Sequence, residues 1–357
     1  MIKILHSADW HMDAPLRQFA EPQRQVLRQQ MLEIPGRIAE IVRREGCQIV
    51  LLAGDLFDGP CTKSGCESVA SALRSMKVPV FVAPGNHDFY GEDSPWFRET
   101  WPENVHIFKK QEITSFRIPE LDCRVYGAAF TGQSCPGLLE GFRADCDERH
   151  ALMVLHGDPT SPDSPYCPVT AGQVREAGLD YLALGHIHAG GGFDAGAGLC
   201  AWPGCPMGHG FDETGTKGVL VVEVEEKAVA RFVPVEGTRF YSLSVRVGEH
   251  PLDSVLQVLP GGGSDDFYRI RLTGEADPTQ MEFVRSGIPG YPNLTLTDET
   301  VLRQELWEGA GEDTLEGLYF GILRNSAEGQ SEQVQEELRL AAKLSRQILM
   351  GMEVELP

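Results

Sequence analysis

One motif in this chain places three metal-binding or proton-transferring side chains directly after a short apolar run. Residues 80–83 are apolar, end in a Pro-Gly turn signal and are followed by Asn86, His87 and Asp88. An amide oxygen, an imidazole and a carboxylate on one turn can bind a metal ion, transfer a proton or do both. A polar turn that caps a strand has the same composition, so the motif needs support from the rest of the chain.

Four other apolar runs end in residues of the same chemical kind. They are followed by Asp9 with His11, by Asp55, by His156, and by His186 with His188. Each has an ordinary explanation, since a histidine after a strand is often a hydrogen-bonded loop residue and an aspartate often caps a turn. Five such strand ends in one chain indicate a common cause.

A site for two metal ions accounts for the whole series. Residues i and i+2 of an extended segment point to the same side, so each of the Asp-x-His and His-x-His pairs offers two side chains to one place. Imidazole, carboxylate and amide ligands without thiolate favour manganese, with iron or zinc as alternatives. Two divalent ions about 3.5–4 Å apart can hold a phosphoryl group and activate water. The sequence therefore predicts hydrolysis of a phosphoester.

The elements that must position these residues alternate between strand and helix at the start of the chain. Strands over residues 2–5, 49–53 and 80–83 are separated by helical patterns, which predicts parallel strands whose carboxyl ends meet at one edge. Pro35 should kink or split the first helix. Ser64 and Glu67 form a capping-box pattern that should open the second.

The later segments consist mainly of shorter predicted strands. Short strands are predicted at 105–108, 124–129, 152–155 and 181–184, with a short helix at 174–177. A glycine-rich loop is predicted after the last of these strands, and a hairpin at 218–224 and 229–235 beyond it. A small α+β unit should follow near Phe240. From Asp298 onward the apolar residues recur at helical spacing, beginning with Leu302 and continuing to Met352.

Composition limits the classes of function. The chain has 357 residues, 42% apolar and 23% charged, and no apolar run long enough to span a bilayer. No secretory signal is visible, and nine cysteines without a CxxC pair predict reduced thiols in a cytoplasmic protein. A net charge of −21 argues against a broad basic surface for nucleic acid, although bound divalent cations would reverse the sign locally.

The ordered motifs resemble those of the calcineurin-like metallophosphoesterases. HSADWHMDAPL, GDLFD, GNHD and GHIH, followed by WPGCPMG and KGVLVVEV, are most similar to the SbcD family of DNA-repair exonucleases and, within it, to the YhaO-type branch. The resemblance implies an α/β metallophosphoesterase fold, a two-sheet β-sandwich flanked by helices, with a small α+β capping domain and a helical C-terminal segment. It implies a nuclease domain over 1–238, a DNA-recognition capping domain over 239–297 and a helical segment over 298–357.

The resemblance also implies a role for each site residue. One metal ion would be bound by Asp9, His11 and His188, and a second by Asn86, His156 and His186, with Asp55 bridging both. His87 would act beside the scissile phosphate, donating a proton to the leaving 3′ oxygen or stabilising the charge of the transition state.

Three nearby positions are less clear from the sequence. Asp88 either orients His87 or caps the turn. Asp58 replaces a histidine that assists catalysis in part of the family, so exonuclease efficiency is in question. His209 has no assigned role and is interpreted as a surface loop residue.

The leading functional hypothesis is a manganese-dependent DNA nuclease for repair, an exonuclease that could also cut single strands internally. Residues 239–357 favour it, because a minimal phosphodiesterase would not need them. The alternative is a phosphodiesterase or phosphatase of the same fold that acts on nucleotides or other small phosphoesters, which the acidic charge favours. A third hypothesis is a catalytically silent scaffold that tethers DNA ends.

The resemblance implies two protein partners besides DNA. One is an SbcC-type coiled-coil ABC ATPase, for which the helices after Asp298 are the candidate docking surface. The same helices could equally pack against the chain itself, and their acidic residues fit either interpretation. The other partner is a second copy of the chain in a homodimer.

Overall fold

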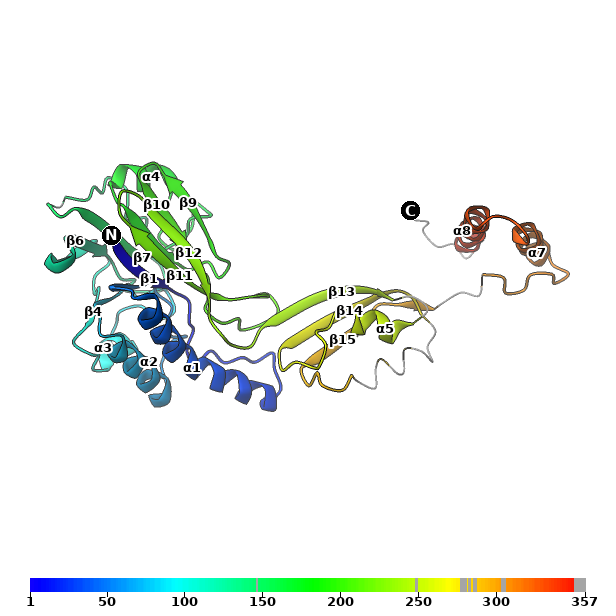
Figure 1. Cartoon of the computed structure of the whole chain (residues 1–357), viewed down its shortest axis with the longest axis horizontal. Coiled ribbons are helices and arrows are strands. Elements are labelled where there is room, and N and C mark those ends of the chain that lie inside the picture. The colour runs from blue at the N-terminus through cyan, green and yellow to red at the C-terminus, as the bar shows by residue number, and fades with distance from the viewer. Residues whose placement is uncertain are drawn as a thin grey trace. The chain divides into compact units, whose positions relative to one another are not determined.

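The computed structural model describes residues 1–145, 147–247, 250–276, 281, 284, 288–302 and 306–349. The chain divides into two compact units (Figure 1). The larger unit comprises Met1–Ser242, Ser264–Arg269 and Tyr291–Leu294, and the other described residues belong to the smaller unit.

The first sheet of the larger unit has six strands in the order β12-β11-β1-β2-β3-β4. Its strands are β1 (Ile2–Ser7), β2 (Ile49–Leu52), β3 (Val80–Val82), β4 (Val105–Ile107), β11 (Gly218–Val224) and β12 (Ala228–Pro234). Strands β1 to β4 are parallel, whereas β11 runs antiparallel to β1 and β12 antiparallel to β11. The connecting helices are α1 (Glu21–Glu45), α2 (Lys63–Met76) and the short α3 (Pro95–Arg98).

The second sheet also has six strands, in the order β5-β6-β7-β8-β10-β9. They are β5 (Thr114–Ile118), β6 (Cys123–Gly127), β7 (His150–His156), β8 (Tyr181–Gly185), β9 (Gly191–Ala195) and β10 (Gly198–Trp202). The four inner strands are parallel, and the edge strands β5 and β9 are antiparallel to their neighbours. A short 3-10 turn, Pro119–Leu121, and helix α4 (Ala171–Ala177) complete this half.

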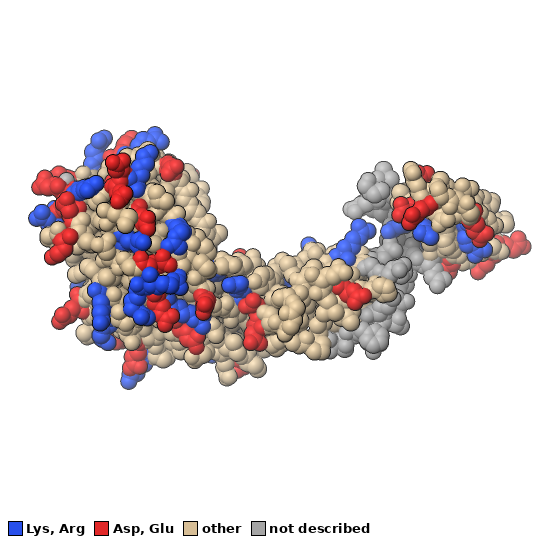
Figure 2. Space-filling view, viewed as in Figure 1, with Lys and Arg blue, Asp and Glu red and all other residues tan. Residues whose placement is uncertain are grey.

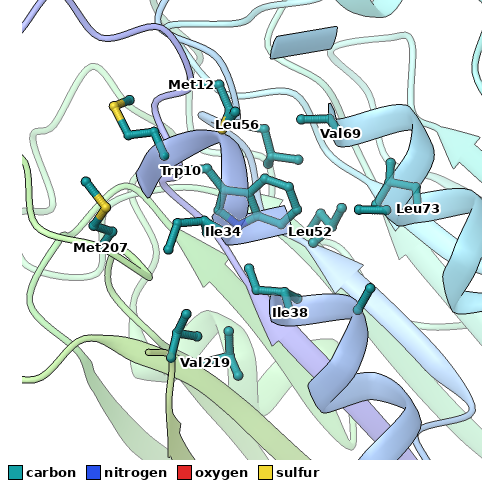
Figure 3. Packing of buried hydrophobic residues seen from close by; sticks show 14 of the residues in the cluster. Trp10, Met12, Ile34, Ile38, Leu52, Leu56, Val69, Leu73, Met207 and Val219 are labelled. Carbon is teal, nitrogen blue, oxygen red and sulfur yellow. The ribbon is translucent and has the colours of Figure 1, made fainter. Parts of the chain in front are cut away.

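Buried side chains join the two sheets face to face. Alternate residues of the central strands, such as Ile4 and Leu51, pack against residues of the second sheet such as Leu152 and Ala183. The opposite faces of β1 and β2 pack under α1 and α2, where the Trp10 indole lies among aliphatic side chains (Figure 3). The predicted fold class is therefore confirmed: a two-sheet sandwich with helices on its outer faces.

The later elements form a third sheet, which has four strands, and a pair of helices. Strands β13 (Phe240–Val247), β14 (Phe267–Ala276) and β15 (Leu294–Asp298) lie in that order, and β16 (Val301–Leu302) pairs with β14. Helix α5 (Pro251–Leu256) accompanies them, and α7 (Leu315–Ala327) and α8 (Glu332–Leu349) pack together as a helical pair. The predicted helical C-terminal segment is confirmed.

Helix α1 continues through Pro35 as one helix, so it is not split, and a kink at Pro35 stays a prediction. Three other local predictions are wrong. Helix α2 is capped by Thr62 rather than Ser64, because the Thr62 hydroxyl accepts the Gly65 N–H. Leu302 lies in a strand, and the next helix among the described residues begins at Leu315. The glycine-rich stretch after β8, predicted as a loop, contains β9 and β10. Met352 lies outside the described residues.

Candidate metal centre

All seven predicted ligands lie at or shortly after the carboxyl ends of buried parallel strands. Asp9 and His11 follow β1, Asp55 follows β2, Asn86 follows β3, His156 ends β7, and His186 and His188 follow β8. Because the two sheets lie face to face, these strand ends converge at one end of the sandwich.

Four of these residues adopt backbone conformations that side chains usually avoid. The φ angles are 54° at Asp9, 46° at His11, 52° at Asp55 and 93° at His186. Each such conformation costs on the order of 1 kcal/mol or more and persists only where its surroundings hold it. Such strain gathered at one place is typical of a functional site.

One half of the cluster is formed by Asp9, His11 and His188. One ligand atom from each lies within 4.8 Å of the others. The two imidazoles approach with 3.1 Å between their Nε2 atoms. Two ring nitrogens that face each other so closely form a pair of donors suited to one cation.

The other half is centred on His156. Its Nε2 lies 2.9 Å from Oδ1 of Asn86 and 3.3 Å from Oδ2 of Asp55. The same Asp55 oxygen is 3.9 Å from Nε2 of His11, so this carboxylate lies between the two halves. The His186 ring is 5.2 Å from that of His156, centroid to centroid, and the His186 backbone N–H donates to Asp9.

Three imidazoles are oriented by an oxygen behind the ring. Nδ1 of His156 lies 2.9 Å from the carbonyl oxygen of Ala53, which can only accept, so the proton is on Nδ1. Nδ1 of His188 pairs with Glu213, and Nδ1 of His11 is 3.5 Å from Asp58. Each ring therefore directs Nε2 toward the centre, which is the usual arrangement of histidines that bind metals.

Burial makes the charges of this cluster hard to satisfy without a cation. Asp9 is fully buried and Asp55 is 2% exposed. Burial raises the pKa of Asp9. At Asp55 burial acts in the same direction, but the neighbouring histidines His156, His11 and His87 together outweigh it and hold the pKa below its usual range. Buried carboxylates among imidazole nitrogens form a donor set that fits divalent cations.

His87 lies beside the cluster and remains accessible. Its side chain is 47% exposed, and its ring packs edge-on against His11 with 4.8 Å between centroids. Nδ1 lies 2.7 Å from Oδ1 of Asp58, and this hydrogen bond raises the pKa of His87. The carboxylate that orients His87 is thus Asp58, the position at which part of the family has histidine.

Asp88 occupies the turn-capping position rather than one that orients His87. Its buried carboxylate accepts backbone N–H groups from Gly85, Asp55, Leu56 and Phe57, as well as the indole N–H of Trp96. This single carboxylate therefore joins the loop after β2 to the loop after β3. The two loops carry Asp55 and Asn86.

The interpretation of His209 as a surface loop residue is wrong. Its side chain is only 13% exposed, with Nδ1 3.0 Å from Glu213 and Nε2 3.2 Å from the carbonyl oxygen of Trp10. Glu213, which sequence reasoning missed, therefore contacts both His188 and His209. The only feature of the sequence that pointed to Glu213 was His209, four residues earlier, for which no role had been assigned.

A family model for the calcineurin-like phosphoesterases matches residues 2–190, more than half of the chain. The chain belongs to the calcineurin-like phosphoesterase family. Membership places this phosphoesterase among hydrolases of phosphoesters and implies divalent metal binding, in agreement with the donor set above.

Similar proteins extend the comparison. The phosphoesterase is 30% identical over 239 residues to the uncharacterized metallophosphoesterase YhaO of Bacillus subtilis, a match over 62% of this chain and 57% of that protein. The chain thus spans little more than half the length of that relative. It is 22% identical over 340 residues to the SbcD component of the nuclease SbcCD of Staphylococcus epidermidis, covering 84% of this chain and 86% of that one.

Solved structures with related folds include a dimetal phosphatase from Danio rerio. It is 14% identical, with a TM-score of 0.43, and the match covers 66% of this chain and 98% of that one. TT1561 of Thermus thermophilus is 12% identical with a TM-score of 0.40, over 65% and 98% of the two chains. Among the described residues of the phosphoesterase, no helix has both the length and the apolar character needed to cross a membrane.

Proposed function

We propose that this phosphoesterase is a DNA nuclease that hydrolyses phosphodiester bonds with two divalent cations, manganese being the preferred ion. The observation that carries the proposal is the set of histidines whose Nδ1 atoms are fixed from behind and whose Nε2 atoms converge with buried carboxylates. The similarity to a component of a nuclease supports it, since that match continues well beyond the metal centre.

Each residue of the centre would have a distinct role in holding the metal ions. Asp9, His11 and His188 would hold one cation, Asn86, His156 and His186 would hold the other, and Asp55 would contribute to both. Bound divalent ions bind phosphate oxygens and lower the pKa of water.

His87 and Asp58 perform the proton transfer in the proposal. Asp58 holds Nδ1 of His87 and favours the protonated ring, while nearly half of the side chain remains open to substrate. The other ring nitrogen can donate a proton to the leaving 3′ oxygen or stabilise negative charge on the phosphorus centre. An aspartate at position 58 thus stabilises the protonated form of His87. It does not supply the positive charge that a histidine at position 58 would carry.

The exposed apolar face of the C-terminal helices supports the proposal that a partner protein binds there. Leu315, Ile322, Ile348 and Leu349 are each at least 60% exposed on α7 and α8, and a cavity of 510 Å³ lies between these helices. Such a concentration of exposed apolar side chains is unusual on a monomer. We propose that an SbcC-type ATPase docks there, because the similar nuclease component is named as part of an SbcCD assembly.

A phosphodiesterase or phosphatase of small esters remains the second candidate. The net charge of −21 favours it. On the face shown in Figure 2, basic residues of the larger unit lie interspersed with acidic ones.

The decisive experiment incubates purified protein with linear duplex DNA, with single-stranded DNA and with a small chromogenic phosphodiester, in manganese and then in chelator. The proposal predicts manganese-dependent degradation of DNA that chelator abolishes. Rapid turnover of the small ester with intact DNA would favour the second candidate. Metal binding without hydrolysis of any ester would favour a silent scaffold.

A further inference from the structure

Two buried thiols contact each other beside the half of the cluster that is centred on His156. Cys135 and Cys167 are 1% and 0% exposed, although the residues on either side of each are exposed or half-buried. Their thiols are hydrogen-bonded to each other. None of the roles proposed above uses this pair.

The backbone holds the two cysteines at a spacing that a disulfide can span. The N–H of Cys167 donates to the carbonyl oxygen of Cys135 at 2.7 Å, and the N–H of Cys135 donates to that of Pro165 at 2.9 Å. These bonds pair Cys135 with Tyr166 in an isolated parallel bridge. With standard bond lengths, the 2.7 Å contact keeps the Cα atoms of the two cysteines within roughly 6.5 Å of each other. Disulfides join Cα atoms that are about 4.4–6.8 Å apart.

The contact between the thiols activates one of them. The hydrogen bond from Cys135, reinforced by the backbone N–H of Leu138, holds the pKa of the Cys167 thiol below its usual range although burial acts against this. The same hydrogen bond raises the pKa of Cys135, which therefore keeps its proton. A thiolate next to a thiol is the arrangement of an attacking cysteine and its resolving cysteine.

The thiol pair adjoins both imidazoles that are assigned to the second cation. Phe130 packs in one buried cluster with the two cysteines, and its ring lies edge-on to that of His156 with 5.4 Å between centroids. Tyr166, the bridge partner of Cys135, lies with its ring centroid 4.7 Å from that of His186. A change at the thiols is therefore one residue away from a ring that packs on His186.

His186 depends on this packing more than the other histidines of the centre. No hydrogen bond to its ring nitrogens occurs among the described residues, so the Tyr166 and His156 rings that pack on it set its orientation. Residues 157–169, which carry Tyr166, form neither helix nor strand and are joined to Cys135 only through the isolated bridge. A segment of this kind opens locally at low free energy, which admits a small oxidant to the thiols.

We propose that Cys135 and Cys167 form a disulfide when the protein is exposed to a hydroperoxide, and that this disulfide fixes Tyr166 against His186 and tightens binding of the second cation. Because the thiols are already in contact, the bond forms without rebuilding the bridge to Tyr166. The inference rests on the proposed role of His186 as a ligand of that cation.

The reaction is balanced by the peroxide. The Cys167 thiolate attacks one peroxide oxygen, the O–O bond breaks, and hydroxide leaves, which converts Cys167 to a sulfenic acid. The sulfur of Cys135 then attacks the sulfenic sulfur and the S–S bond forms. The displaced hydroxide takes the proton of the Cys135 thiol and leaves as water. The two sulfurs together lose two electrons, which the peroxide accepts.

The first test maps the disulfide in chelator, without metal or DNA. The wild type is treated with hydrogen peroxide, free thiols are alkylated, and the peptides are identified by mass spectrometry. A link between Cys135 and Cys167 should appear and should be lost in dithiothreitol. Cys47 and Cys200 are the controls and should remain thiols, since burial raises the pKa of each. A folded protein without the link between Cys135 and Cys167 would overturn the proposal.

The second test measures manganese binding by calorimetry for reduced protein and for oxidised protein after the peroxide is removed. Oxidation should tighten one of the two manganese sites by about threefold or more, because orientation of a ligand sets metal affinity. Cys135→Ser and Tyr166→Ala, with folding verified by circular dichroism, should lose this response, and Tyr166→Phe should keep it. Cys61→Ser is the matched control and should keep it too, because Cys61 contacts Cys66 in a separate thiol pair. A smaller change in the crosslinked wild type would overturn the link to His186.

The two tests separate failure of the dithiol site from failure of the nuclease proposal. Tightening on oxidation in a protein that leaves DNA intact in manganese would support the dithiol site and refute the nuclease. Degradation of DNA by a protein that forms no link between Cys135 and Cys167 would refute the dithiol site alone.

Discussion

Replacing Asp88 with asparagine should destabilise the larger unit and weaken the metal centre together. The carboxylate is 2% exposed and accepts from the N–H groups of Gly85 at 2.7 Å and Leu56 at 2.9 Å, and from the Trp96 indole at 2.9 Å. Asparagine keeps one acceptor oxygen and turns an NH2 group toward the donors that the other oxygen served. At least one buried donor is left without a partner in either orientation of the amide.

The size of the effect follows from these contacts. A hydrogen bond to a charged group contributes about 1.5–3 kcal/mol, and an unpaired buried donor costs about 1–3 kcal/mol. We therefore expect Asp88→Asn to lose about 3–5 kcal/mol of unfolding free energy. Because Asp88 joins the loops that carry Asp55 and Asn86, the affinity for manganese should fall as well.

The assay is urea denaturation followed by tryptophan fluorescence, together with calorimetric titration of manganese. Asp93→Asn is the control, because this side chain is 85% exposed and pairs only with a surface arginine in the described contacts, so its loss should stay within about 0.5 kcal/mol. A stable Asp88→Asn variant that binds manganese normally but has no turnover would refute this reasoning and assign Asp88 a direct catalytic role.

Four further predictions follow from the site and its surroundings. His87→Gln should keep both metal ions and lose most turnover, and full activity would remove His87 from the mechanism. Asp55→Ala should lose metal binding and activity together, so calorimetry that still detects two bound manganese ions would exclude a bridging role. Glu213→Gln should lower manganese affinity about 10- to 100-fold through loss of the His188 orientation, with Glu225→Gln as an exposed control. His6 is fully buried between the Tyr181 hydroxyl and the Leu184 carbonyl oxygen, and burial lowers its pKa to about 3. Its neutral form therefore contributes stability that is fully present above pH 6.5 and is lost as pH falls toward 3, about 2 kcal/mol of it by pH 5. Urea midpoints measured against pH should show this slope in the wild type and not in His6→Leu, and identical slopes would contradict the assignment.

The convergence of strand ends could be predicted from the sequence because its cause is local. A short apolar run followed by a polar turn indicates a buried strand and its carboxyl end, and parallel strands bring such ends to one edge. Asp9, Asp55 and His156 each follow this pattern. Their positions at strand ends could be predicted without knowledge of contacts between residues that are distant in the sequence.

The residues that support the ligands could not be found in this way. Glu213 reaches His188 from a segment without periodicity, and Asp58 reaches His87 across 29 positions. His209 was interpreted as a surface loop residue because no role could be assigned to it, whereas the loop folds back against Trp10. Contacts of this kind depend on tertiary folding, which local pattern does not encode.

The errors in secondary structure have a similar origin. Strand β9 contains two glycines and forms only because β10 provides a partner, so propensity alone predicted a loop. Leu302 fits a helical spacing with later leucines, but pairing with β14 fixes it in a strand. In both places a neighbouring strand outweighed the local preference.

The central claim is that seven side chains hold a pair of divalent ions, and crystals soaked in manganese test it most directly. Anomalous scattering at the manganese edge should show two peaks among Asp9, His11, Asp55, Asn86, His156, His186 and His188, with Asp55 contacting both. A map with no anomalous peak among these residues would contradict the claim.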